Sequence, residues 1–159
     1  MSDERERESL PDETRSAIEE VRTVLPGMQA LFGFQLIAVF NERFEKIPGA
    51  ARVLHLCSLL LVATAIACVM APAAFHRIAE RGWVSRVLID VTSNFLTAGM
   101  AMLAIALAFE VGLVSALVLS SMPAGILCGV SLAVLLTVFW FVLPIRHRFR
   151  YRPGSREKM

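Results

Sequence analysis

The sequence predicts an all-α integral membrane protein, a four-helix bundle with a short amphipathic N-terminal helix. Two observations support this prediction. Of the 159 residues, 56% are hydrophobic and only 19% are charged, whereas a soluble domain has about 45–50% apolar and about 25% charged residues. The charges also gather at the two ends of the chain, because eight of the fourteen acidic residues precede Val21 and six of the sixteen Lys and Arg residues follow Pro144. The long uncharged stretches between these ends are typical of membrane spans.

The N-terminal segment is divided into a tail and an interfacial helix. Residues 1–9 are so highly charged that we expect a disordered acidic tail. Pro11 is typical of a helix start, since proline fits the first turn. A thin apolar stripe with helical spacing follows, made of Ile18, Val21 and Leu25. We therefore expect an amphipathic helix over residues 10–25, which lies at the inner membrane surface and ends at Pro26-Gly27.

Four membrane spans are expected within a domain of residues 26–146. The spans are predicted at residues 28–47, 53–75, 87–112 and 124–145. The first is the most polar, because strictly apolar sequence ends at Phe40 and about 20 residues are needed to cross the bilayer core. The boundary between the third and fourth spans is weakly marked, since residues 111–119 are also apolar. The best break is at Ser120-Ser121.

The distribution of basic residues predicts the orientation. Four Lys and Arg residues precede the first span, three follow the second and six lie after the fourth, thirteen in all, against three on the other side of the membrane. The positive-inside rule places the thirteen in the cytoplasm. We therefore expect a multi-pass protein of the cell inner membrane with cytoplasmic N and C termini and a basic cytoplasmic tail over residues 147–159.

Small residues mark two helix faces that allow close packing. The fourth span carries Gly125, Gly129 and Ala133 at four-residue spacing, and the third carries a polar and small-residue seam from Asn94 to Ala108. Because lipid gives helices little hydrophobic reason to associate, close van der Waals packing is important in membranes. Both faces are interpreted either as packing within one chain or as a homo-oligomer interface.

Polar residues collect near the predicted inner face of the membrane. This candidate inner polar cluster contains Gln29, His76, Arg77, Asp90 and Asn94. It is interpreted in three ways. The residues either fix how the helices meet, contact anionic lipid headgroups, or form a cytoplasmic access point for protons or ions.

A second group of polar residues lies near the predicted outer face. This candidate outer charged cluster contains Glu42, Arg43, His55 and Glu110. We expect Glu110 to pair with Arg43, since they lie at the same predicted depth. Between the two clusters the midplane has few polar groups, Gln35 and Ser58 among them. A single bundle therefore lacks the series of carboxylates expected of a proton pump.

The sequence gives no sign of enzymatic chemistry. It contains no nucleophile–base–acid set, no glycine-rich phosphate loop and no cluster of metal ligands, so we expect no catalytic activity, no cofactor and no metal. Cys57, Cys68 and Cys128 are odd in number and lie in apolar stretches, where cysteine behaves as a small apolar residue. The short basic tail is interpreted as a topology signal, and we expect no nucleic-acid binding.

Two stretches carry a resemblance to a known family. They are LPGMQALFGF at residues 25–34, with Arg43-Phe44 downstream, and APAAFHR at residues 71–77. Over about residues 20–145 the chain resembles domain-of-unknown-function family 6328, small bacterial four-span proteins of which some are labelled sodium:proton antiporters. The matching positions are Gln29, Arg43, His76 and Arg77, whereas Phe75 stands where a Tyr is usual. The resemblance implies four spans in a bacterial inner membrane.

The sequence favours a non-enzymatic membrane protein that self-associates or serves as an accessory subunit. Its expected partner is the lipid bilayer. The alternative is a small cation or proton transporter or channel formed by several copies.

Overall fold

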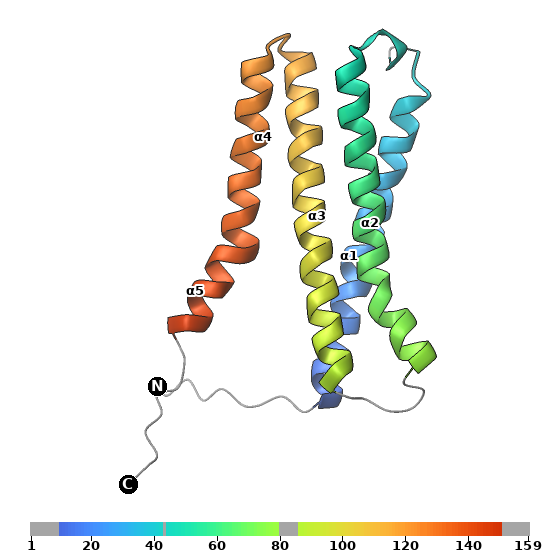
Figure 1. Cartoon of the computed structure of the whole chain (residues 1–159), viewed down its shortest axis with the longest axis vertical. Helices are drawn as coiled ribbons and strands as arrows, with labels where there is room; N and C mark the ends of the chain where they lie inside the picture. Colours follow the sequence, from blue (N-terminus) through green and yellow to red (C-terminus); the bar gives the residue numbers. More distant parts are fainter. Residues whose placement is uncertain (1–9, 43, 80–85, 151–159) are drawn as a thin grey trace. The chain divides into compact units, whose positions relative to one another are not determined.

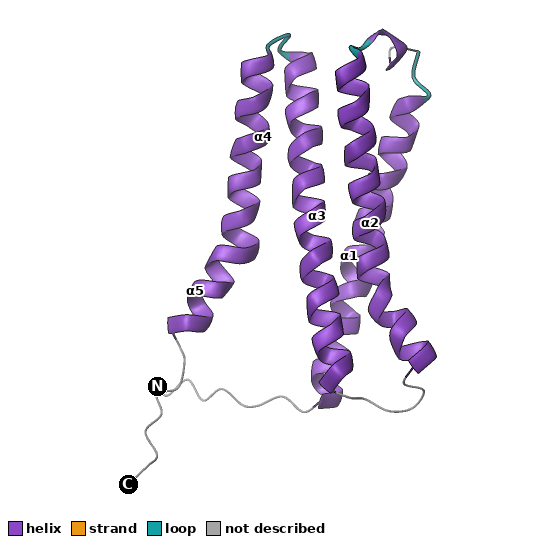
Figure 2. Cartoon of the chain, in the orientation of Figure 1, coloured by secondary structure: helices purple, strands orange, loops and turns teal. Residues whose placement is uncertain are grey.

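The computed structural model describes residues 10–42, 44–79 and 86–150, and within them every regular element is helical (Figures 1 and 2). The elements are α1 (Leu10–Val39), the 3-10 helix η1 (Phe44–Lys46), α2 (Gly49–Ala79), α3 (Arg86–Val118), α4 (Met122–Thr137), the π-helical turn η2 (Val138–Val142) and α5 (Leu143–Arg150). The helices belong to two compact units that divide within α3, after Ala106. The predicted all-α fold is confirmed. The predicted acidic tail of residues 1–9 and most of the predicted basic tail lie outside the described residues.

The predicted break at Pro26-Gly27 is wrong, because α1 is one helix of 30 residues that passes through Pro26. A proline inside a helix removes one hydrogen bond and crowds the preceding turn. Here packing on both sides of the proline outweighs that effect: Val21 and Leu25 pack on a buried cluster that contains Met28 itself. The apolar stripe therefore continues across the proline at helical spacing, and the predicted interfacial helix and first span form one element.

The C-terminal end of α1 also differs from the prediction, since the helix stops at Val39 and not near residue 47. Its last turn tightens through two hydrogen bonds with three-residue spacing. The Phe40 N–H donates to the Ile37 carbonyl at 3.1 Å, and the Asn41 N–H donates to the Ala38 carbonyl at 3.3 Å. Such bonds are common where a helix ends. A turn and η1 then lead into α2.

In the first unit, α1 and α2 run side by side (Figure 1), and α3 contacts α2 at Gly99. Gly99 of α3 lies close to the backbone of α2. A Cβ atom on Gly99 would lie 3.1 Å from Cγ2 of Val69 and 3.2 Å from the carbonyl oxygen of Ala65. Ala65 and Val69 are buried with Met28 in the core of this unit. Glycine therefore lets the two backbones approach where a larger residue would separate them.

The second unit is a hairpin of the end of α3 and α4. Gly125 and Gly129 of α4 face α3: a Cβ on Gly125 would lie 2.5 Å from Cβ of Ala116 and 2.6 Å from the carbonyl oxygen of Gly112. A Cβ on Gly129 would lie 2.8 Å from the carbonyl oxygen of Ala108. These two glycines therefore pack within the chain, which is one of the two interpretations that the sequence left open.

The turn between α3 and α4 lies at the predicted break. The third helix runs to Val118, beyond the predicted residue 112. The Ser121 N–H donates to the carbonyl of Ala116 at 3.1 Å, and Ser120 has a φ of 49°. This pattern is the helix ending in which glycine normally takes the left-handed position. Pro123 then stands in the first turn of α4, where its missing N–H is tolerated.

After α4 the helix widens before Pro144. The Leu143 N–H donates to the Val138 carbonyl across the π-helical turn η2. In a regular helix the Pro144 ring would meet the carbonyl of Trp140 and leave it without a donor. The turn lies directly before this proline, and α5 continues beyond it. Local π-helical turns of this kind change the register of a helix without ending it.

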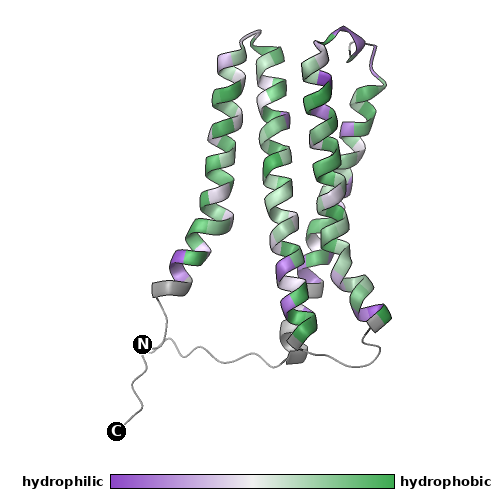
Figure 3. Cartoon of the chain, viewed as in Figure 1, coloured by the Kyte–Doolittle hydropathy of each residue, from purple (hydrophilic) through white to green (hydrophobic). Residues whose placement is uncertain are grey.

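Three helical segments are long and apolar enough to cross a membrane: Gly49–Ile78, Val87–Val118 and Met122–His147. Figure 3 shows hydrophobic residues along most of α2, α3 and α4. By length and composition α1 is not among these segments, because its N-terminal half is hydrophilic. Three candidate spans are thus present within the described residues, and the fourth remains a prediction.

Candidate functional site

Three polar side chains are buried between α1, α2 and α3 in the first unit. Gln35, His55 and Ser58 are only 5%, 5% and 0% exposed. Gln35 Nε2 donates to Ser58 Oγ at 3.0 Å, and Ser58 Oγ donates to the carbonyl oxygen of Ala106 at 3.1 Å. One hydroxyl group of α2 therefore accepts a hydrogen bond from α1 and donates one to α3. We call Gln35, His55 and Ser58 the buried polar network.

His55 extends this network to the end of α1. Its Nε2 lies 3.1 Å from the backbone carbonyl oxygen of Gln35. Since a carbonyl oxygen can only accept, Nε2 carries the hydrogen in this contact. The His55 ring also meets the edge of the Phe44 ring, with centroids 5.3 Å apart and planes at 66°. A histidine that bonds a carbonyl near a helix C-terminus stabilises that end, and this contact lies one turn before the last residue of α1.

The structure places the predicted outer residues in different surroundings. Glu42 is exposed, His55 is buried and Glu110 is half-buried in the second unit. Arg43 lies outside the described residues, so the predicted Arg43–Glu110 pair remains a prediction. The sequence analysis did not predict that His55 is buried beside Gln35 and Ser58, which were assigned to the midplane. The spacing of His55 and Ser58 could have indicated this, because residues three positions apart share a helix face.

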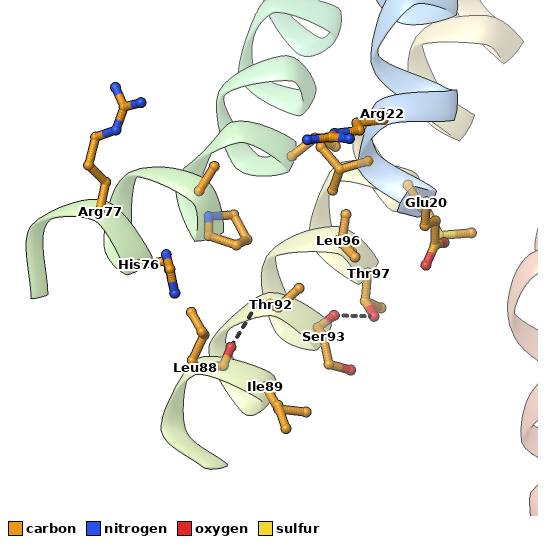
Figure 4. Close-up of a pocket in the computed structure, with 15 residues that line it drawn as sticks. Glu20, Arg22, His76, Arg77, Leu88, Ile89, Thr92, Ser93, Leu96 and Thr97 are labelled. Atoms are coloured by element: carbon orange, nitrogen blue, oxygen red, sulfur yellow. Dashed lines mark hydrogen bonds between the residues drawn. The ribbon is translucent and has the colours of Figure 1, made fainter. Parts of the chain in front are cut away.

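A cavity of about 600 Å³ lies elsewhere in the first unit, between the N-terminal half of α1, the C-terminal end of α2 and the start of α3 (Figure 4). Its apolar lining includes Val69, Pro72, Leu88, Leu96 and Met100. Its polar lining consists of Glu20, Arg22, His76, Arg77, Thr92, Ser93 and Thr97. Sites for small molecules in proteins commonly have about 300–1,000 Å³ and this mixture of apolar walls with a few polar groups. We call this feature the inner cavity.

The basic side chains of the inner cavity come from two helices. Figure 4 shows Arg22 extending from α1 toward α2, and Arg77 directed away from the α3 side chains. Arg22 and Arg77 are exposed, whereas His76 is half-buried. Among the lining residues that the structure describes, Glu20 is the one acidic residue. The charged groups around the cavity are therefore more basic than acidic.

The hydroxyl groups of α3 are held against their own helix. Thr92 Oγ1 donates to the Leu88 carbonyl at 2.7 Å, and Thr97 Oγ1 donates to the Ser93 carbonyl at 2.7 Å. Each threonine thus uses its hydrogen within α3, and its oxygen retains lone pairs that accept from a donor. These contacts fix the hydroxyl groups on the helix that forms one wall of the inner cavity.

The structure brings together two of the five predicted inner residues. His76 and Arg77 line the inner cavity. Gln29, Asp90 and Asn94 are exposed and are not part of its lining. Gln29 is exposed because Met28 before it is 3% exposed and faces the core. Successive side chains in a helix are rotated by about 100° about the helix axis, so Gln29 points away from the core.

Arg22 and Glu20 are lining residues that the sequence analysis missed. They were assigned to a separate interfacial helix that ends at Pro26. Because α1 continues through Pro26, its N-terminal half lies alongside α2 and α3.

Among the residues that the structure describes, no group of three or more His, Cys, Asp or Glu is arranged to hold a metal ion. The three cysteines are free thiols.

A family model described as a family of unknown function, DUF6328, matches residues 3–144 of the chain. The resemblance that two short stretches carried is therefore confirmed over nearly the whole chain. No curated protein and no solved structure matches the chain.

Proposed function

The chain belongs to the DUF6328 family, and we propose that this protein is a non-enzymatic bacterial inner-membrane protein that acts as a self-associating or accessory subunit. In this proposal α1 is the fourth span, and both termini lie in the cytoplasm. The excess of basic residues near those termini supports this orientation.

The observation that carries the proposal is the exposure of α4. Within the described chain only 6% of its membrane-spanning window is buried, compared with 28% for α2 and 22% for α3. One face of α4 packs on α3 through Gly125 and Gly129. Large apolar side chains that are more than half exposed follow the rest of α4 and η2, among them Ile126, Leu127, Val130, Val134 and Phe139. Within its own unit α4 therefore packs on α3 through one face, and its other, apolar face is available to a neighbouring transmembrane helix.

Disulfide cross-linking in native membranes tests this proposal. In a background with Cys57, Cys68 and Cys128 replaced by Ala, single cysteines are introduced at Leu127 and Val134 on the exposed face of α4. Leu60→Cys, on the exposed face of α2, is the matched control. We expect a cross-linked dimer for the α4 cysteines and none for the control.

A cross-link from α4 to a different protein supports the accessory role and argues against self-association. The proposal is wrong if no α4 cysteine cross-links in the membrane and the protein in mild detergent has the mass of one copy. The purified full chain in nanodiscs provides the same mass measurement without detergent.

A small cation or proton transporter formed by several copies is the second candidate. The observation that favours it is the burial of His55 beside Gln35 and Ser58, since ionisable residues inside membrane helices often serve ion movement. Proteoliposomes with a pH- or sodium-sensitive dye test it. Flux that disappears in His55→Gln supports transport, and flux equal to that of empty liposomes contradicts it.

A further inference from the structure

We infer that the inner cavity binds an amphiphile with an anionic, phosphate-bearing headgroup, of which a phospholipid of the inner leaflet is the expected source. This inference does not depend on how copies of the chain associate. It rests on the lining of the cavity, on the charges around it and on its place in the fold.

The lining divides into an apolar and a polar part. Val69 and Leu88 are each only 3% exposed, and with Leu96 and Met100 they form a surface suited to hydrocarbon. Arg22 and His76 lie on the two other helices that close the cavity. A ligand that satisfies both parts must combine an apolar body with a polar head. A small hydrophilic ion would leave the apolar lining without a partner.

The basic side chains of the lining favour an anion. Among the lining residues that the structure describes, Arg22 and His76 are set against one carboxylate, that of Glu20, whereas Arg77 is directed away from the α3 side chains (Figure 4). Glu20 and Arg22 are two residues apart on α1, a spacing that does not place side chains on the same helix face. Figure 4 shows Arg22 extending across the cavity toward α2. An arginine guanidinium group presents several N–H donors in a plane, which suits the oxygens of a phosphate.

The place of the cavity in the fold suits a lipid. It lies where α2 ends and α3 begins, at the end of the helices that carries the basic side predicted to face the cytoplasm. The wall on α3 runs from Leu88 to Met100, which corresponds to about 18 Å of helix. Such a wall is long enough to contact both a headgroup and the first part of an acyl chain. Basic pockets between membrane helices on the cytoplasmic side are known to hold anionic headgroups.

The experiment compares lipid binding to the purified full chain by native mass spectrometry. The protein is titrated with dioleoylphosphatidylglycerol and, separately, with dioleoylphosphatidylcholine. We expect the anionic lipid to bind more tightly, and Arg22→Gln to weaken its binding by about fivefold, the effect of about one basic residue near an anionic surface. Arg52→Gln, an exposed arginine outside the cavity lining at the other end of α2, is the matched control and should change the affinity by less than about twofold.

A second variant tests the apolar part of the cavity. Ala73→Trp places a bulky ring at a lining position and should abolish binding of the anionic lipid while the protein keeps its helical circular dichroism and elutes as a single species. Equal binding of both lipids to the wild type, or unchanged lipid binding in both cavity variants, overturns the inference.

Competition with inorganic phosphate distinguishes the two possible sources of the anion. If phosphate at millimolar concentration displaces the lipid completely, the site recognises a free anion, and the assignment to an amphiphile is wrong.

Discussion

The two units of this protein differ in the contacts between their helices: buried hydrogen bonds join the helices of the first unit, whereas the tightest glycine contacts lie in the second. In the first unit, α1, α2 and the part of α3 that ends at Ala106 are joined by buried hydrogen bonds through Gln35 and Ser58. In the second unit, the end of α3 and α4 meet through glycines, and the contact depends on the close approach of two backbones. Hydrogen bonds tolerate small changes in helix separation, whereas a glycine contact does not tolerate an added side chain. The two units should therefore differ in which substitutions break them.

The largest effect is expected from Gly125→Val in the second unit. The added side chain would meet the Gly112 carbonyl oxygen and the Ala116 backbone, since even a Cβ would lie 2.6 Å and 3.0 Å from them. Because these are backbone atoms that cannot rotate away, α3 and α4 must separate. We expect a loss of about 3 kcal/mol in the free energy of unfolding, measured by unfolding in mixed micelles with sodium dodecyl sulfate.

The matched control for this substitution is Gly33→Ala in α1, because a Cβ on Gly33 meets nothing within 4 Å. It should leave the protein unchanged or stabilise it by about 0.5–1 kcal/mol, the helix preference of alanine over glycine. Equal destabilisation by both substitutions would contradict the idea that close packing limits the second unit.

A smaller effect is expected from Ser58→Ala in the first unit. The substitution removes the hydroxyl that bonds both Gln35 Nε2 and the Ala106 carbonyl at a fully buried position. We expect a loss of about 1–2 kcal/mol. Thr64→Ala is the control, since the Thr64 hydroxyl is exposed and bonds only the Leu60 carbonyl of its own helix. The same unfolding assay applies, and a loss no greater than that of the control would contradict a structural role for the network.

The smallest effect is expected at the turn that closes the second unit. Ser120 adopts a left-handed conformation with a φ of 49°, which glycine adopts without a steric penalty. Ser120→Gly should therefore stabilise the protein by about 0.5–1 kcal/mol. Ser121→Gly is the comparison, because Ser121 has an extended backbone with a φ of −141°. If both glycine variants change the midpoint of unfolding in the same direction and by the same amount, the left-handed conformation is not the cause.

Signals along the chain predicted some features of the fold, and contacts between distant segments decided others. The turn between α3 and α4 was predicted because Pro123 and the two preceding serines interrupt an apolar run locally. The break at Pro26 was not real, because α1 is held across the proline by Met28 and by residues of α2. A local signal fails where tertiary packing stabilises the conformation that the signal argues against.

The candidate sites show the same division. His76 and Arg77 were predicted to lie together because both are at the end of the second predicted span, near the predicted inner face, and both line the inner cavity. Arg22 was missed because its position depends on the continuity of α1. The bond from Gln35 to Ser58 joins residues 23 positions apart, and it depends on how two helices are rotated about their axes. The hydropathy pattern of these helices does not specify that rotation.

The fully buried hydroxyl of Ser58 has a consequence for biosynthesis. During translation α1 emerges first and carries the amide of Gln35, whose partner on α2 is made 23 residues later. The acceptor for the Ser58 hydroxyl, on α3, follows after another 48 residues. In a bilayer core an unsatisfied polar group is costly, so the amide of Gln35 on α1 depends on α2 for its partner, and the hydroxyl of Ser58 on α2 depends on α3. A chain that stops before Ala106 should therefore keep the bond between α1 and α2 but leave the Ser58 hydroxyl without its acceptor, and the quality control of such truncated products would act on α2 first.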